Sequence, residues 1–88
     1  MYFEWSKKGM DYFMKTLDSI NLNQCVLIKS INCTGKLRRR FLDLGIIPGT
    51  LITPIFSSIF NDPIAYLIRN SVIAIRNEDA KKIVVDVN

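Results

Sequence analysis

The sequence predicts a mainly β fold, a small antiparallel barrel with a short inserted helix and a helical arm at its N-terminus. Three observations support this fold class. The chain has 88 residues, enough for one domain, and 49% of them are hydrophobic, enough for a dense core. Short runs rich in Val, Ile and Leu recur along the chain. Asn, Asp, Gly and Pro separate these runs, as they do between short strands.

The first 15 residues differ in composition from the rest, because they hold five of the nine aromatic side chains. Towards their end, Phe13, Leu17 and Ile20 fall at i, i+4 and i+7, the spacing of an amphipathic helix. We therefore divide the chain into an aromatic-rich arm, 1–15, and a barrel, 16–88. Two interpretations of the arm stay open: it is loosely docked, or it packs on a partner or a second copy.

The barrel is predicted to begin with a strand over 24–31, which is rich in Val, Leu and Ile. A short helix is predicted over 36–44. Within it Leu37, Phe41 and Leu44 lie at i, i+4 and i+7, so these three side chains are expected to form its buried face.

Gly45, Pro48 and Gly49 are predicted to shape the turns after this helix. Glycine is the residue expected just past a helix C-terminus, where the chain turns left-handed. Proline followed by glycine predicts a type II turn, because proline presets the first central φ and glycine supplies a positive second one. We interpret all three residues as architectural.

The remaining elements are short and close together. Residues 50–60 are rich in β-formers, and Pro54 among them requires an edge or a bulge because it lacks an N–H. We expect strands over 64–69 and 72–76 around a turn at 70–71, a helical turn over 77–82 and a closing strand over 83–87. Five short strands with these insertions fit SH3-like and OB-like barrels. The short hairpins favour the SH3-like one.

The titratable residues exclude several classes of function. The net charge of +4 is mildly basic and favours an acidic partner. The chain has no histidine, which excludes a His-activated nucleophile and removes the commonest transition-metal ligand. Cys25 and Cys33 lack metal-ligand spacing, and we interpret them as reduced structural thiols, although spacing alone leaves a disulfide open. We therefore predict a non-enzyme that holds no metal or cofactor.

Arg38, Arg39 and Arg40 form the densest charge cluster. They have a plain interpretation as a solvated helix face, with one arginine paired to Asp43. They also have a functional one, because guanidinium groups bind carboxylates and phosphates bidentately. No readable groove or stacking aromatic accompanies the cluster, so a protein is the expected partner and nucleic acid the alternative.

Residues 44–61 carry no charge, which is long enough to raise the question of a membrane span. Gly45, Pro48, Gly49 and Pro54 would break a helix facing lipid, whose backbone must satisfy itself. We expect a turn and a strand there, and no span. The N-terminus shows no signal peptide, so the protein is expected in the cytoplasm.

The run "RRRFLDLGIIPGT", residues 38–50, resembles the signature segment of the FeoA family. The likeness extends through "SSIFNDPIAYLI" and "VIAIRNEDAKKIVV", and with the opening "LDSINLNQCVLIKSI" it covers residues 17–87. The order and spacing of these segments together are specific. Where the family commonly has glycine this chain has Asn23, Asn61 and Asn70, and asparagine also tolerates a left-handed backbone.

The resemblance implies an SH3-like accessory protein of ferrous iron transport. Its partner would be FeoB, a membrane transporter with an intracellular G domain, whose assembly or nucleotide turnover it would tune by binding; an arginine of the cluster could dock or act on bound GTP. Self-association stays open through the arm. The expected contact residues are Arg38, Arg39, Arg40, Leu42, Ile46 and Leu51, carried by the turn of Gly45, Pro48 and Gly49.

Overall fold

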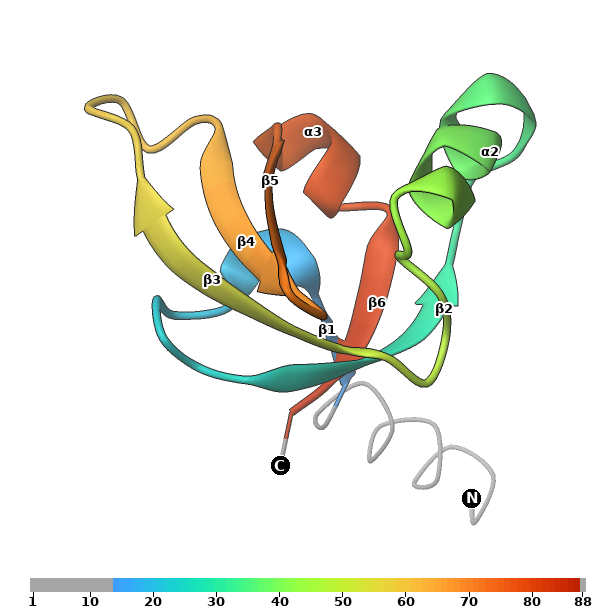
Figure 1. Cartoon of the computed structure of the whole chain (residues 1–88), viewed down its shortest axis with the longest axis horizontal. Helices are drawn as coiled ribbons and strands as arrows, with labels where there is room; N and C mark the ends of the chain where they lie inside the picture. Colours follow the sequence, from blue (N-terminus) through green and yellow to red (C-terminus); the bar gives the residue numbers. More distant parts are fainter. Residues whose placement is uncertain (1–13, 88) are drawn as a thin grey trace, which may run out of the picture.

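The structure is a computed structural model, and it describes residues 14–87. Nine short elements follow one another along the chain (Figure 1). They are β1 (Met14–Thr16), the 3-10 helix η1 (Leu17–Ser19), β2 (Val26–Ile31), α2 (Gly35–Asp43), β3 (Leu51–Ser57), β4 (Ile64–Ile68), β5 (Ser71–Ile75), α3 (Asn77–Ala80) and β6 (Ile83–Asp86).

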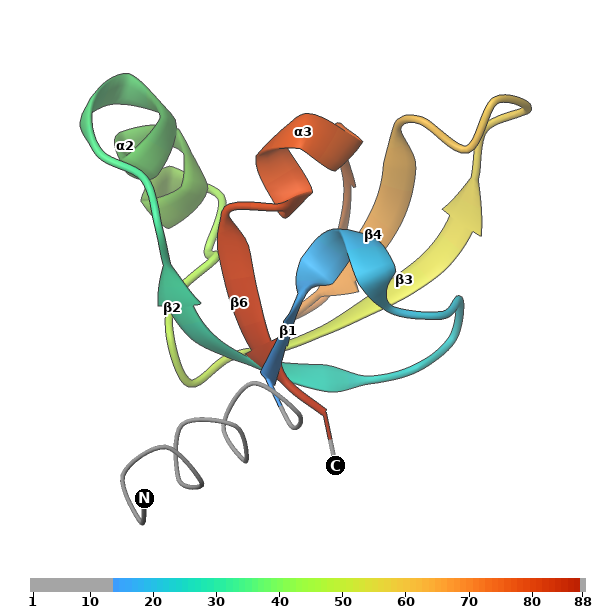
Figure 2. The same ribbon diagram turned by 180° about the vertical axis from the view of Figure 1, so that it is seen from behind.

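The strands form a single antiparallel sheet in the order β1-β6-β2-β3-β4-β5. The sheet curls around its buried face, and α2 stands at one end of the molecule while the β3–β4 connection projects at the other (Figures 1 and 2). This arrangement confirms the predicted small antiparallel β fold with a short inserted helix. It contains one strand more than the five predicted for the barrel.

The additional strand, β1, lies where the sequence suggested a helix. Met14–Thr16 pairs with β6, with Met14 opposite Asp86 and Thr16 opposite Val84, and only a single 3-10 turn follows. The helix expected to include Leu17 and Ile20 is therefore wrong over its described part. Leu17 and Ile20 are nevertheless both buried. They lie three residues apart, which is one turn of a 3-10 helix, so η1 places both side chains on the same side. The rest of the arm lies outside the described residues.

The core fills the inside of the curled sheet and is almost wholly aliphatic. Among the described residues no polar or charged residue is buried. Full burial stabilises each large side chain by about 1.5–3 kcal/mol, so this cluster is the main source of stability. Its members are Leu17, Ile20, Val26, Ile28, Ile31, Phe41, Ile46, Ile52, Tyr66, Ile68, Ile75, Ala80, Ile83 and Val85.

The turns follow the sequence with one shift of register. Pro54 sits where the pairing of β3 with β4 is irregular, which confirms the predicted bulge. Asn23 and Asn61 have φ of 68° and 61°, as expected. Between β4 and β5, Ile68 pairs with Ser71, so the turn lies one residue earlier than predicted. The positive φ there, 55°, therefore belongs to Arg69 and not to Asn70.

Candidate protein-binding surface

Helix α2 is short and owes its position to one buried side chain. Its residues are mostly Lys, Arg and Leu, which are good helix formers. A nine-residue helix is marginal in isolation, so the burial of Phe41 in the core is what fixes it on the sheet. Leu37 packs partly against the core, as predicted, whereas Leu44 is exposed.

The end of α2 explains why Leu44 is not buried. Gly45 has φ of 87°, and its N–H donates to the carbonyl of Leu42 at 3.1 Å while that of Ile46 donates to the carbonyl of Phe41 at 2.9 Å. These two bonds are the Schellman pattern, which reverses the chain and brings the residue after glycine back against the helix. Ile46 takes the core position that helical spacing assigned to Leu44.

The predicted type II turn is present two residues later. Gly49 has φ of 94°, and the N–H of Thr50 donates to the carbonyl of Ile47 at 3.1 Å, closing the turn around Pro48 and Gly49. The N–H of Gly49 also donates to the carbonyl of Ile28 at 2.8 Å. Gly45, Pro48 and Gly49 thus shape the two turns that connect α2 to β3.

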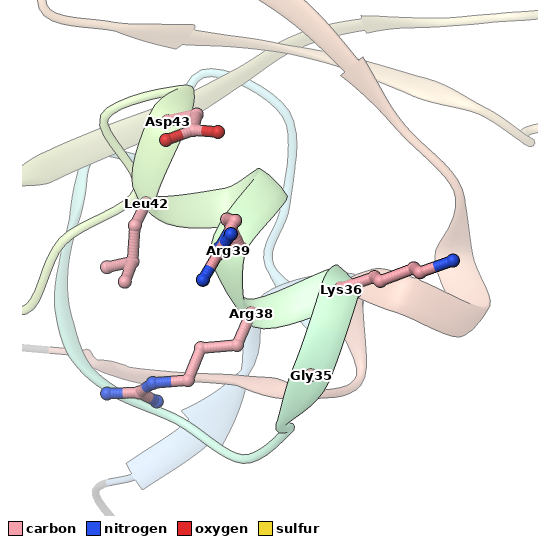
Figure 3. Close-up of a pocket in the computed structure, with 6 residues that line it drawn as sticks. All are labelled: Gly35, Lys36, Arg38, Arg39, Leu42 and Asp43. Atoms are coloured by element: carbon pink, nitrogen blue, oxygen red, sulfur yellow. The ribbon is translucent and has the colours of Figure 1, made fainter.

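The three arginines diverge around the helix and do not form one patch. Arg38 and Arg39 face a hollow beside α2, and Arg38 extends to the same side as Leu42 (Figure 3). The Nη1 of Arg38 donates to the carbonyl of Ile31 at 3.3 Å, which ties this side chain to the end of β2. Arg40 instead lines a separate hollow. The lining of the first hollow is Gly35, Lys36, Arg38, Arg39, Leu42 and Asp43.

Lys36 and Asp43 also line this hollow, although they are not among the contact residues predicted from the sequence. Helical spacing could have found them, because residues 36, 39 and 43 are three or four apart and share one side of a helix. We call the set of Lys36, Arg38, Arg39 and Leu42 the α2 surface. No ion pair joins its cations, or Arg40, to another described residue.

The three apolar side chains among the predicted contact residues differ in exposure. Leu51, the first residue of β3, is 58% exposed, and Leu42 on the helix is 40% exposed. Ile46 is fully buried and packs in the core, so its assignment as a contact residue is wrong. The reason is the helix ending described above, which turns residue 46 inwards.

The remaining chemistry of the described residues is sparse. They contain no group of three His, Cys, Asp or Glu side chains that could hold a metal ion. Cys25 and Cys33 are free thiols. Burial, with a smaller contribution from the charges of Asp18 and Asp62, raises the pKa of Tyr66 to about 12. No helix in this part of the chain is long and apolar enough to span a membrane.

Comparison with known proteins identifies the family. The FeoA domain profile matches residues 15–87. The chain belongs to the FeoA family. The family is associated with ferrous iron transport, as the sequence motifs suggested. A comparison with curated proteins gives no match.

Solved FeoA structures share the fold. A FeoA-like protein from Clostridium acetobutylicum is 31% identical, with a TM-score of 0.78, over 85% of this chain and 87% of that one. Iron(II) transport protein A from Clostridium thermocellum is 28% identical over 82% of this chain, with a TM-score of 0.79, and this chain covers 44% of it. The zinc complex of Stenotrophomonas maltophilia FeoA, an SH3 domain protein, is 23% identical, with a TM-score of 0.73, over 81% of this chain and 88% of that one. The SH3-like fold is thereby confirmed.

Proposed function

We propose that this FeoA protein is a cytoplasmic, non-catalytic accessory of ferrous iron transport that docks its α2 surface on the cytosolic part of a FeoB-like membrane GTPase transporter. Family membership supports the transport role. The transporter as partner, the place of docking and the regulation of its nucleotide turnover or assembly are our proposal.

One observation carries the docking site. Helix α2 presents Lys36, Arg38 and Arg39 without an ion pair to any other described residue, beside the exposed side chain of Leu42. Charged rims around apolar contacts are the usual composition of a protein interface. Arginine also binds carboxylates bidentately, so an acidic protein surface with an apolar centre matches this helix.

The mechanism we propose is binding alone. The Schellman ending and the bond from Arg38 to the carbonyl of Ile31 hold the helix and one guanidinium in place before a partner arrives. Preorganised groups lose less conformational freedom on binding, which strengthens the complex. Phe41, the aromatic residue within α2, is buried and offers no ring for base stacking, so nucleic acid is the less favoured partner.

The test is a binding titration of the purified cytosolic domain of FeoB against the full chain, without nucleotide, with GDP and with a non-hydrolysable GTP analogue. We expect saturable binding that Arg39→Glu weakens at least about tenfold, as loss of a well-placed interfacial arginine does. Lys15→Glu is the matched control, because Lys15 is exposed on β1, away from α2 (Figures 1 and 2).

Two results would overturn the proposal. One is no saturable binding in any nucleotide state. The other is equal loss of affinity in Arg39→Glu and Lys15→Glu, which would show a general charge effect. Binding of an oligonucleotide that falls steeply with salt would instead support the nucleic-acid alternative.

A further inference from the structure

The second edge of the sheet, β5, has unpaired backbone groups. Among the described residues β5 pairs only with β4, and the pair Ile68–Ser71 closes their two-residue turn. The closing pair of such a hairpin exchanges both backbone hydrogen bonds, and bonded and non-bonded pairs then alternate. Ser71, Ile73 and Ile75 therefore bond to β4, while the N–H and C=O groups of Val72 and Ala74 point away from the sheet.

This edge lacks the features that usually block strand pairing. Exposed edges are commonly very short, charged, interrupted by proline or bulged. β1, at the other edge, has three residues including Lys15, but β5 has the sequence SVIAI and regular pairing over all five residues. Val72 is exposed and adds an apolar side chain to the edge.

A groove lies beside the C-terminal end of this edge, at Ala74 and Ile75. It has a volume of about 220 Å³, and its walls come from the end of α2 and its C-cap, from the end of β5, from Pro63 and from α3. Arg40 and Leu44 form the helical side, and Arg76 continues β5 on the other. The full lining is Arg40, Leu44, Pro63, Ala74, Ile75, Arg76 and Asp79.

We propose that this β5–α2 groove binds an extended acidic segment of a partner protein, which adds to the sheet as a strand beside β5. The outward groups of Val72 and Ala74 supply backbone hydrogen bonds to such a segment, and Leu44 supplies an apolar contact. Strand addition of this kind takes its affinity from the main chain and its specificity from side-chain pockets. The inference needs no particular partner, and it uses Arg40, which lies outside the α2 surface.

The charges of the groove decide between a foreign segment and a second copy. Arg40 and Arg76 line it against a single acid, Asp79, so glutamate or aspartate in the segment gains two nearby cations. A second copy would bring its own Arg40 and Arg76 and so add positive charge to a groove that already holds two cations and one acid, whereas an acidic segment balances that charge. An acidic partner segment is therefore the occupant.

The test uses a synthetic peptide of alternating valine and threonine that carries three glutamates, titrated into the full chain and followed by amide NMR. We expect saturable shifts at Val72 and Ala74 and slower hydrogen exchange of their amides. The same peptide with lysines in place of glutamates should bind at least about tenfold more weakly.

Two variants separate strand addition from simple charge attraction. Ala74→Pro removes one outward N–H and keeps the ladder to β4, since proline is tolerated where an edge N–H faces solvent. Ala74→Pro should weaken binding at least about tenfold, because the peptide loses one backbone hydrogen bond and the proline ring keeps it from lying close to β5. Arg76→Glu should have a similar effect, and Lys15→Glu should have none.

The proposal is overturned if the acidic peptide does not bind saturably, if the lysine peptide binds equally well, or if Ala74→Pro leaves its affinity unchanged. Concentration-dependent dimers that Ala74→Pro abolishes would assign the edge to a second copy and overturn it as well. None of these results bears on FeoB binding, which Arg39→Glu tests separately.

Discussion

Helix α2 and the tip of the β3–β4 hairpin, residues 58–63, both leave large apolar side chains in solvent, but different forces hold them. α2 is fixed by burial of Phe41 and Ile46 in the core. The hairpin tip is fixed by polar contacts: the hydroxyl of Ser58 donates to the carbonyl of Asp62 at 2.9 Å and accepts from its N–H at 3.1 Å. The tip projects away from the sheet (Figure 1).

The hairpin tip is also tied to the start of α3. The N–H of Asn77 donates to Oδ1 of Asp62 at 2.9 Å, and its side-chain amide donates to the carbonyl of Asn61 at 2.9 Å. These bonds hold a loop whose Ile59 and Phe60 are 92% and 86% exposed. Exposed apolar side chains therefore do not reveal what holds a segment in place. Burial of neighbouring side chains in the core holds α2, whereas hydrogen bonds hold the hairpin tip.

The largest effect should follow from emptying the core position just after α2, which holds the end of the helix against the core. Ile46→Ala removes a fully buried side chain and should lower the free energy of unfolding by about 2–5 kcal/mol, from lost burial and the cavity left behind. Urea unfolding followed by circular dichroism measures this change. A loss below about 0.5 kcal/mol, the range of surface substitutions, would contradict the core anchoring of α2.

The second effect concerns Tyr66, whose hydroxyl is buried in the core. Burial, and to a smaller extent the charges of Asp18 and Asp62, raises the pKa of Tyr66 to about 12. The Tyr66 hydroxyl has no hydrogen-bond partner among the described residues. An unfolded tyrosine ionises near 10. The stability that Tyr66 contributes is therefore complete below about pH 10 and is lost as the pH rises towards 12.

Tyr66→Phe tests this pH dependence, because phenylalanine keeps the ring and cannot ionise. We expect the free energy of unfolding of the native chain to fall relative to the variant by roughly 2 kcal/mol between pH 10 and 12, the order that a shift of this size implies. Denaturant titrations of both proteins across this range measure the difference. Parallel pH profiles would show that Tyr66 ionises equally in the folded and unfolded states.

The third effect concerns the backbone that ends α2. A Cβ on Gly45 would have no contact closer than 4.0 Å, to the Arg69 side chain, so φ of 87° and not crowding is the constraint. Gly45→Ala should cost about 1–2 kcal/mol, the penalty of an L-residue in the left-handed region. Gly45→Asn should recover part of that loss, since asparagine tolerates this conformation. Equal stability of all three proteins in thermal melts would contradict the Schellman ending.

The sequence predicted this part of the molecule well because local chemistry determines it. The glycine after α2, the Pro48–Gly49 turn and the bulge at Pro54 follow from backbone dihedrals and a missing N–H, and all three are present. Leu44 was misplaced because helical periodicity assigned it to the buried face of α2, whereas the chain reverses at Gly45 and Ile46 takes that core position.

Long-range pairing was less predictable. β1 forms only because β6 lies beside it, and its three residues carry no strand signal that outweighs the helical spacing of Leu17 and Ile20. Three successive arginines on a helix necessarily point in different directions, because neighbouring residues project about 100° apart. Which hollow each of them lines depends on where the sheet lies around α2. The groove beside β5 likewise exists only after strands distant in sequence are placed.

The smallest effect is expected for a matched substitution at the hairpin tip. Ile59→Ala makes the same chemical change as Ile46→Ala, but at a side chain that is 92% exposed. We expect the free energy of unfolding to change by less than about 0.5 kcal/mol, because the polar contacts of the hairpin tip do not involve this side chain. The same urea titration compares the two variants directly. If Ile59→Ala lowered the free energy of unfolding nearly as much as Ile46→Ala, apolar burial would anchor the hairpin tip as well. The two regions would then be held by the same force.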